Sequence, residues 1–236
     1  MIPRRCCALA LCLAGALLTP IAASSALRSV AALPANTPVH RAPSVLGTCV
    51  LGTVGAPELL GDLFPPNDIY FMLIRPTTCG PCSVTVLSNV HVWLNFRKPC
   101  SVPVSISVVR AFGSPCMQPD EGQILFPAFP TLLTATDIGT QEFVVAVPAE
   151  WRLDTDAFLA VNFTSETDSC SLAGEQPRIA LVAGCPHCVA YERVFGETGD
   201  VCQSGAGLPL ISVDVSECVP TPTLRRSWGT LKLRYR

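Results

Sequence analysis

The chain has 236 residues and 13 cysteines, with 49% hydrophobic residues, 14% charged residues and a formal net charge of −2. A chain of this length and apolar content can bury a sizeable core as one domain. All 18 acidic residues lie at or before Glu217, so the body of the protein is acidic and is not suited to binding nucleic acid.

The first 26 residues are predicted to be a signal peptide. Arg4 and Arg5 precede an apolar run of 13 residues from Cys6 to Leu18, and small residues ending in Ala26 follow. Export signals have this order of charged, apolar and small residues. The apolar run is shorter than the roughly 20 residues that a membrane-spanning helix needs. We therefore expect cleavage near Ala26, a secreted, periplasmic or cell-surface location, and no transmembrane span in the mature protein.

Ten cysteines follow position 26. An even number of cysteines in an exported chain favours disulfides over free thiols, although the number alone does not determine which cysteines pair. We expect all ten to form structural disulfides: Cys49, Cys79, Cys82, Cys100, Cys116, Cys170, Cys185, Cys188, Cys202 and Cys218.

Short alternating apolar runs separated by Pro, Gly and Asp turns predict a β protein. Residues 27–46 lack a clear period and are expected to be an extended lead-in. The domain over 47–218 shows no helix pattern and is predicted to be all-β, a disulfide-stapled antiparallel β-sandwich of jelly-roll or immunoglobulin-like kind. Its predicted strands are 48–54, 69–75, 84–96, 102–112, 143–147, 157–163, 178–183 and 210–215.

Two neighbouring apolar rows predict one specific disulfide. Apolar residues occupy even positions over 84–96 and again over 102–112, with a short polar segment between the two runs. In an antiparallel hairpin that keeps both rows on one face, Cys82 lies opposite Cys116. We therefore predict a Cys82–Cys116 disulfide, provided that no bulge shifts the register.

Two Cys-x-x-Cys motifs provide a redox alternative. The sequence Cys-Gly-Pro-Cys at 79–82 matches thioredoxins, and Cys-Pro-His-Cys at 185–188 matches bacterial periplasmic thiol oxidases. Such chemistry needs a helix N-terminus and a nearby cation, which a helical turn over 189–195 and the histidine of the second motif could supply. The chain lacks the alternating strands and helices of a thioredoxin fold. A secreted thiol-disulfide oxidoreductase using Cys185 and Cys188 is kept as an alternative function.

No set of residues in the sequence amounts to a metal or catalytic site. The two Cys-x-x-Cys motifs are about 100 residues apart, which does not fit zinc-finger spacing. Asp154 and Asp156 offer calcium two carboxylates, too few to specify a site. His91 falls on the polar face of its predicted strand, where a solvated side chain is expected. We therefore predict no metal, no cofactor and a non-enzymatic protein.

The C-terminal tail, 219–236, differs in charge from the rest of the chain. Five of its residues are basic, which leaves 9 basic against 18 acidic residues between the signal peptide and the tail. The body is therefore near −9 and the tail near +5. As a strand, the last six residues would have Leu231, Leu233 and Tyr235 on one face and three cations on the other. Candidate attachment residues are Arg225, Arg226, Trp228, Lys232, Arg234, Tyr235 and Arg236.

Two segments resemble a group of uncharacterised secreted bacterial proteins of β-sandwich type. They are Cys185-x-x-Cys188-x-x-Tyr191 and the terminal Trp228-Gly229-x-Leu231-Lys232-x-x-Tyr235-Arg236. The resemblance covers roughly the last fifty residues. It implies a bacterial exported protein and brings no activity with it.

The leading hypothesis is an exported, non-enzymatic β-sandwich that serves as a binding, display or structural module of the cell envelope or extracellular space. The basic tail would bind an anionic envelope surface or the secretion machinery, or dock on the acidic body of its own chain. A carbohydrate-binding module is a further alternative, by analogy of architecture. Its exposed aromatic platform would be Trp93, expected on the face away from the core, whereas Trp151 is expected to cap a loop.

Overall fold

A computed structural model describes the central part of the chain. Within it, residues form two largely antiparallel β-sheets and two short 3₁₀ helices, η1 (Pro76–Cys79) and η2 (Val201–Ser204). None of the described helices is long and apolar enough to cross a membrane. The signal peptide predicted over 1–26 and the tail residues after Pro220 lie outside the described residues, which are 30–41, 49–63, 67–164, 170, 176–205 and 207–220.

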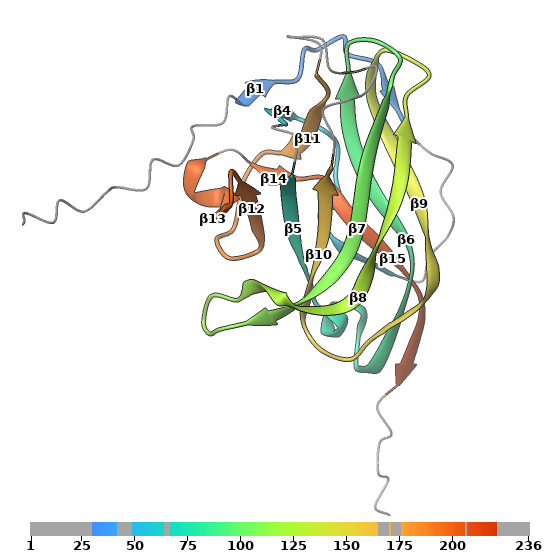
Figure 1. Cartoon of the computed structure of the whole chain (residues 1–236), viewed down its shortest axis with the longest axis vertical. Coiled ribbons are helices and arrows are strands. Elements are labelled where there is room, and N and C mark those ends of the chain that lie inside the picture. The colour runs from blue at the N-terminus through green and yellow to red at the C-terminus, as the bar shows by residue number, and fades with distance from the viewer. Residues whose placement is uncertain are drawn as a thin grey trace, which may run out of the picture.

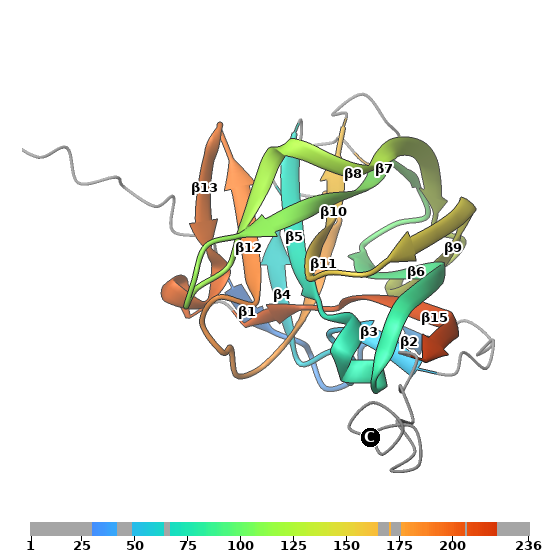
Figure 2. The same ribbon diagram turned by 90° about the horizontal axis from the view of Figure 1, so that it is seen from below.

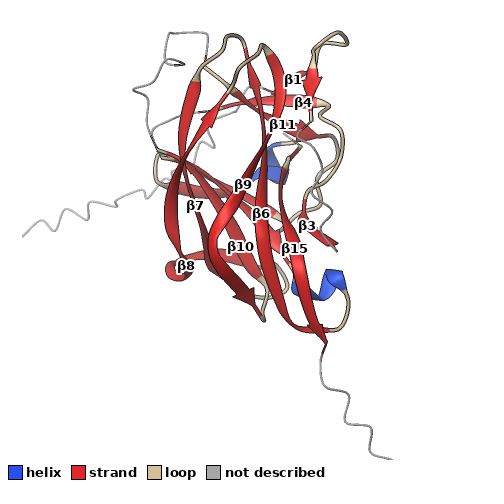
Figure 3. Cartoon of the chain, turned by 90° about the vertical axis from the view of Figure 1, so that its right-hand side faces the viewer, coloured by secondary structure: helices blue, strands red, loops and turns tan. Residues whose placement is uncertain are grey.

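The larger sheet is built around one long central strand, β6 (Cys82–Phe96). Strand β9 (Gly139–Leu153) pairs along one edge of β6, while β15 (Ile211–Pro220) and then β11 (Arg178–Val182) pair along the other. Figure 3 shows β9, β6 and β15 side by side. The remaining strands of this nine-stranded sheet are β1 (Val30–Ala32), β2 (Val39–His40), β3 (Cys49–Gly52), β4 (Leu59–Asp62) and β14 (Leu208–Pro209).

The second sheet has six strands in the order β13-β12-β5-β10-β7-β8. Seen from below, the two sheets form two layers with the core between them (Figure 2). The strands of this sheet are β5 (Asp68–Ile74), β7 (Ser101–Phe112), β8 (Gln118–Thr134), β10 (Ala157–Phe163), β12 (Ala190–Val194) and β13 (Glu197–Asp200).

The prediction of an all-β, disulfide-stapled sandwich is confirmed. All eight predicted segments overlap observed strands, namely β3, β5, β6, β7, β9, β10, β11 and β15. The helical turn suggested over 189–195 is wrong, because β12 pairs with β5 and β13 there. Strand β8 was not predicted, since Pro119, Pro127 and Pro130 break its apolar pattern. Proline is tolerated there because β8 is an edge strand, whose outer N–H groups need no ladder partner.

The predicted hairpin between residues 84–96 and 102–112 is wrong. Strands β6 and β7 belong to different sheets, and their apolar rows face each other across the core. Alternation places both rows on one side but cannot tell a neighbour within a sheet from a partner across a sandwich. The row of β6 also changes parity at a bulge between Leu87 and Asn89, so that Leu87 faces the core in place of Val86.

The predicted Cys82–Cys116 disulfide is also wrong. Cys82 lies at the start of β6 beside the end of β15 and is bonded to Cys218. Cys116 lies in the other sheet, in the connection between β7 and β8, and is bonded to Cys188. The other bridges are Cys49–Cys79, Cys100–Cys170 and Cys185–Cys202. The five disulfides bond all ten cysteines of the domain.

The N-terminal lead-in joins the larger sheet. Strand β1 pairs with β4, and β2 pairs in parallel with β9. The chain between them crosses the outer face of the sheet, where Trp93 is only 6% exposed and packs in a cluster with Leu60, Ala180 and Leu210. Arg41 lies over the Trp93 ring, 5.9 Å from its centroid. The outer face predicted to present Trp93 to solvent is therefore covered at this point.

Removing the Cys82–Cys218 bridge should destabilise the protein by about 5 kcal/mol on the loop-entropy model. The bridge closes a loop of 136 residues, against 30 residues for Cys49–Cys79. A double Cys82→Ala/Cys218→Ala variant should therefore lose about 1 kcal/mol more than Cys49→Ala/Cys79→Ala does. Chemical denaturation of the three proteins measures both differences. Equal losses would show that loop length does not govern these bridges.

Candidate functional site

The two sheets leave one side of the sandwich open. Strand β8 is at the edge of the smaller sheet and β9 at the edge of the larger one, where β2 is the one described strand that pairs with its outer side. The two edge strands lie along the same side of the molecule (Figures 1 and 2). Between them lies a hollow of about 420 Å³, lined by Phe129, Pro130, Thr131, Leu132, Leu133, Phe143, Val144, Val145 and Ala146.

Two aromatic side chains, Phe129 and Phe143, line this hollow and pack on rings of the core. Phe126 stacks on Trp151 at 5.2 Å between ring centroids, and Phe129 meets the same ring edge-on at 5.6 Å. Phe143 packs edge-on against Phe96 at 5.7 Å. Trp151, expected to cap a loop, is a core residue. Phe129 and Phe143 therefore connect the hollow to the core cluster.

The apolar residues along the rim are incompletely covered. On β9, the core-side residues Phe143, Val145 and Val147 are only partly buried, whereas Val90 and Val92 on the adjacent strand are fully buried. On β8, Leu132 is 57% exposed. A protein surface rarely leaves contiguous apolar area in contact with water unless that area binds something.

The backbone of β9 presents hydrogen-bonding groups along this rim. The Thr140 amide donates to the Pro38 carbonyl of β2, so N–H groups at even positions of β9 point away from β6. By the alternation of a strand, the amides of Val144 and Ala146 point the same way. Among the described residues, no strand pairs with β9 on that side beyond Gln141. An extended segment added here would find both backbone partners and an apolar floor.

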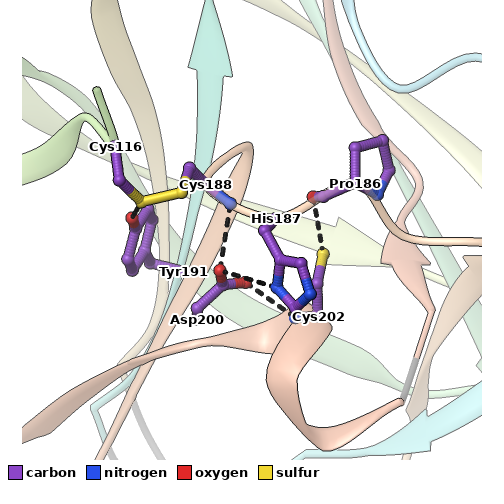
Figure 4. The surroundings of a disulfide bond; sticks show 7 residues. All are labelled: Cys116, Pro186, His187, Cys188, Tyr191, Asp200 and Cys202. Atoms are coloured by element: carbon purple, nitrogen blue, oxygen red, sulfur yellow. Dashed lines mark hydrogen bonds and ion pairs between the residues drawn. A yellow bond between two sulfur atoms is a disulfide. The ribbon is translucent and has the colours of Figure 1, made fainter. Parts of the chain in front are cut away.

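A second hollow, of about 330 Å³, borders the Cys116–Cys188 disulfide on the opposite side of the molecule. Figure 4 shows residues around this disulfide, which come from the β7–β8 connection, the β11–β12 connection, the β12–β13 hairpin and η2. The hydroxyl of Tyr191 lies 3.0 Å from the Cys116 sulfur and donates to it, since a disulfide sulfur carries no proton. Burial and the nearby Asp200 carboxylate raise the pKa of Tyr191 above its usual value.

Asp200 organises the two disulfide loops at this hollow. Its carboxylate accepts hydrogen bonds from the backbone amides of Cys188 at 2.9 Å and Cys202 at 2.8 Å. It also lies 3.5 Å from the ring of His187, which is 68% exposed. Because its carboxylate accepts from these two backbone amides, Asp200 fixes the loop backbone.

In neither Cys-x-x-Cys motif are the two cysteines bonded to each other. Cys185 is bonded to Cys202 and Cys188 to Cys116, while Cys79 and Cys82 are bonded to Cys49 and Cys218. The Cys188 amide donates to Asp200, and strand β12 follows where the redox alternative requires a helix. The dithiol that this alternative requires is absent too, because Cys185 and Cys188 are bonded to other cysteines. Five disulfides indicate an oxidising, extracytoplasmic environment.

His91 lies at the centre of a polar cluster that the sequence analysis did not predict. It was expected to be solvated, but its side chain is only 13% exposed. Its Nδ1 lies 2.9 Å from the Glu142 carboxylate on β9, and its Nε2 lies 3.1 Å from Asp214 on β15 without hydrogen-bond alignment. Asn89 also donates to Asp214. The cluster connects three adjacent strands, and its members lie far apart in the sequence, which is why no local motif revealed it.

Other predicted site residues are not assembled into a site. Asp156 lies 3.7 Å from Arg75, in the loop where calcium binding by Asp154 and Asp156 was considered. Within the described ranges, no group of three or more His, Cys, Asp or Glu side chains could hold a metal ion. The tail candidates Arg225, Arg226, Trp228, Lys232, Arg234, Tyr235 and Arg236 lie outside the described residues.

Comparisons with known proteins found no matching family model, no similar curated protein and no similar solved structure.

The native mature protein should contain no reactive thiol. All ten cysteines of the domain are bonded, so a thiol reagent should react only after denaturation and reduction, and then with ten sulfurs per chain. A pair of thiols that appears at Cys185 and Cys188 under mild reduction, with the fold intact, would instead support a redox function.

Replacing His91 should destabilise the protein. His91→Ala leaves the nearly buried carboxylates of Glu142 and Asp214 facing each other, and we expect a loss of about 2 to 4 kcal/mol in chemical denaturation. Adding Glu142→Gln should recover part of that loss, because it removes one of the charges. The exposed His40 provides the control, and His40→Ala should change stability by no more than about 0.5 kcal/mol.

Proposed function

We propose that this chain is an exported, non-enzymatic β-sandwich that acts by binding an extended protein segment at the open side between β8 and β9. The partner would add a strand to the outer edge of β9 and place alternate apolar side chains into the hollow. The role is that of a binding or display module of the cell envelope or extracellular space.

One observation carries this proposal: a hollow lined by partly buried apolar side chains lies beside an edge of β9 that pairs with no described strand beyond Gln141. The apolar floor would supply affinity by burial, at about 25 cal/mol for each Å² removed from water. The backbone of β9 would supply directional hydrogen bonds. The two together are the requirements of strand addition.

The chemistry of the remaining sites supports a non-enzymatic role. The cysteines of both Cys-x-x-Cys motifs are bonded to partners outside their motifs. His91 is enclosed by two carboxylates that connect strands, and Asp200 is occupied by two backbone amides. Each of these polar clusters already has a structural task in the described fold. A carbohydrate platform at Trp93 is not supported, because that ring is buried.

Export is part of the proposal. The charged, apolar and small-residue order of the first 26 residues supports it, and so does an even set of cysteines that form five bridges. Disulfides of this number form where the compartment is oxidising. The proposed location is therefore the periplasm, the cell surface or the surrounding medium.

Val144→Pro tests the binding edge. Its amide points away from β6, so proline removes a donor that the described sheet does not use, and the fold should remain intact. We expect the fraction of protein retained on the surface of the producing cells to fall about tenfold, since strand addition loses a main-chain bond and meets the proline ring.

Val144→Thr is the matched control, because threonine keeps the amide and the β-branched shape. It should be retained like the native protein. Circular dichroism and thermal unfolding check that both variants fold. Equal retention of Val144→Pro and Val144→Thr would exclude this edge as the binding site.

A further inference from the structure

We propose that a hollow on the outer face of the smaller sheet binds a small neutral ring compound that carries a hydroxyl group, of which phenol is the simplest example. The hollow has a volume of about 150 Å³ and lies on the face of the sheet that points away from the core. Its lining residues belong to β5, β7, β8 and β10. The site is therefore separate from the edge of β9, and the inference does not depend on the proposed function.

The first part of β8 forms the roof of this hollow. In the order of the sheet, β8 lies four places from β12, and four strand spacings measure about 19 Å. Glu121 of β8 nevertheless forms an ion pair with Arg193 of β12 and accepts a hydrogen bond from Thr198 of β13 at 3.1 Å. Residues 121–123 form a bulge without partners on β7. Because a bulge bends its strand, β8 turns back over the outer face and covers part of it.

Small side chains at the centre of the floor make room for a ligand. The floor consists of six residues that face outward from three adjacent strands, namely Ile69 and Phe71 of β5, Ala160 and Asn162 of β10, and Ser105 and Ser107 of β7. Ala160 occupies the middle strand, between Phe71 and Ser107. A cavity of about 150 Å³ with apolar walls binds benzene, so the hollow has the size of a single six-membered ring.

The wall of the hollow carries hydrogen-bonding capacity that the described structure does not use. The side-chain oxygen of Asn162 is buried and has no hydrogen-bond partner. Ser105 lies opposite Asn162 on the adjacent strand and adds a hydroxyl group to the same wall. A buried acceptor without a partner costs free energy that a donor recovers. The terminal torsion of asparagine is broad, so the amide can turn its oxygen towards the hydroxyl of a ligand.

The roof adds a preference for a neutral ligand. Glu121 lines the hollow, and its carboxylate is already matched by Arg193. A carboxylate on the ligand would meet this side chain as a second negative charge, which is unfavourable. Ile124 of the roof is 60% exposed, and a ring beneath it would remove apolar surface from water. The hollow therefore favours a ring alcohol over a ring acid.

Titration of the full-length mature chain with phenol, followed by two-dimensional NMR of the backbone amides, tests the site. The amide signals of Phe71, Ser107 and Ala160 should shift and reach saturation. Benzoate, which has the same ring and a negative charge, should bind at least about tenfold more weakly than phenol.

Asn162→Val separates the hydrogen bond from the fit of the ring. Phenol should lose about tenfold in affinity, because its hydroxyl loses an acceptor. Toluene has a similar shape and no hydroxyl, so its affinity should change by less than about twofold. The variant should remain folded, since the substitution removes a buried oxygen that has no partner.

Ala160→Ile fills the middle of the floor and should abolish the binding of both phenol and toluene. The matched control is Ala32→Ile, at an exposed position of β1 in the larger sheet, which should bind phenol like the native protein. Circular dichroism checks that the variants fold. Ser107→Val narrows the same hollow from the adjacent strand and replaces Ala160→Ile if that variant does not fold.

Three results would overturn the inference. The absence of saturable shifts with phenol would show that the hollow holds water alone. Phenol binding that persists in Ala160→Ile or Ser107→Val, or shifts confined to residues away from the floor, would place the ligand elsewhere. Equal losses of phenol and toluene affinity in Asn162→Val would refute the hydrogen bond and, with it, the class of ligand.

Discussion

Burial of the apolar row of β6 against that of β7 is the interaction on which the rest of the structure depends. Because the two rows face each other across the core, consecutive strands belong to different sheets, and the polar segment between them turns from one layer to the other. Later connections, such as those from β8 to β9 and from β9 to β10, also pass from one sheet to the other. The cysteines at the strand ends therefore meet partners far away in the sequence, such as Cys82 with Cys218.

The same arrangement gives the molecule two different sides. Around the β12–β13 hairpin, two disulfides, the Asp200 carboxylate and an ion pair between Arg193 and Glu121 hold the loops in place. Around β8 and β9, apolar side chains are half-covered, and no described strand pairs with the outer edge of β9 beyond Gln141. The cross-linked side holds the β12–β13 hairpin in position, and the other side is the binding site that we propose.

An edge strand that no described strand covers is a hazard, because it templates pairing with other chains. In β8 three prolines reduce that hazard by removing N–H groups. Between Glu142 and Val147, β9 has no such protection.

The sequence by itself determined the class of the protein: period-two apolar runs and turn residues define eight of the strands, and the number of cysteines indicates disulfides. These are local properties, since side-chain alternation and turn chemistry act within a few residues. Only the tertiary structure decided which strands are neighbours, which cysteines pair and where the core is left open. Leu94 and Ile106 illustrate the reason, because their positions fit a hairpin and a sandwich equally well. The choice between these arrangements depends on strands β9 and β15, which join β6 from distant parts of the chain, place two carboxylates around His91, and leave the outer edge of β9 without a described strand beyond Gln141.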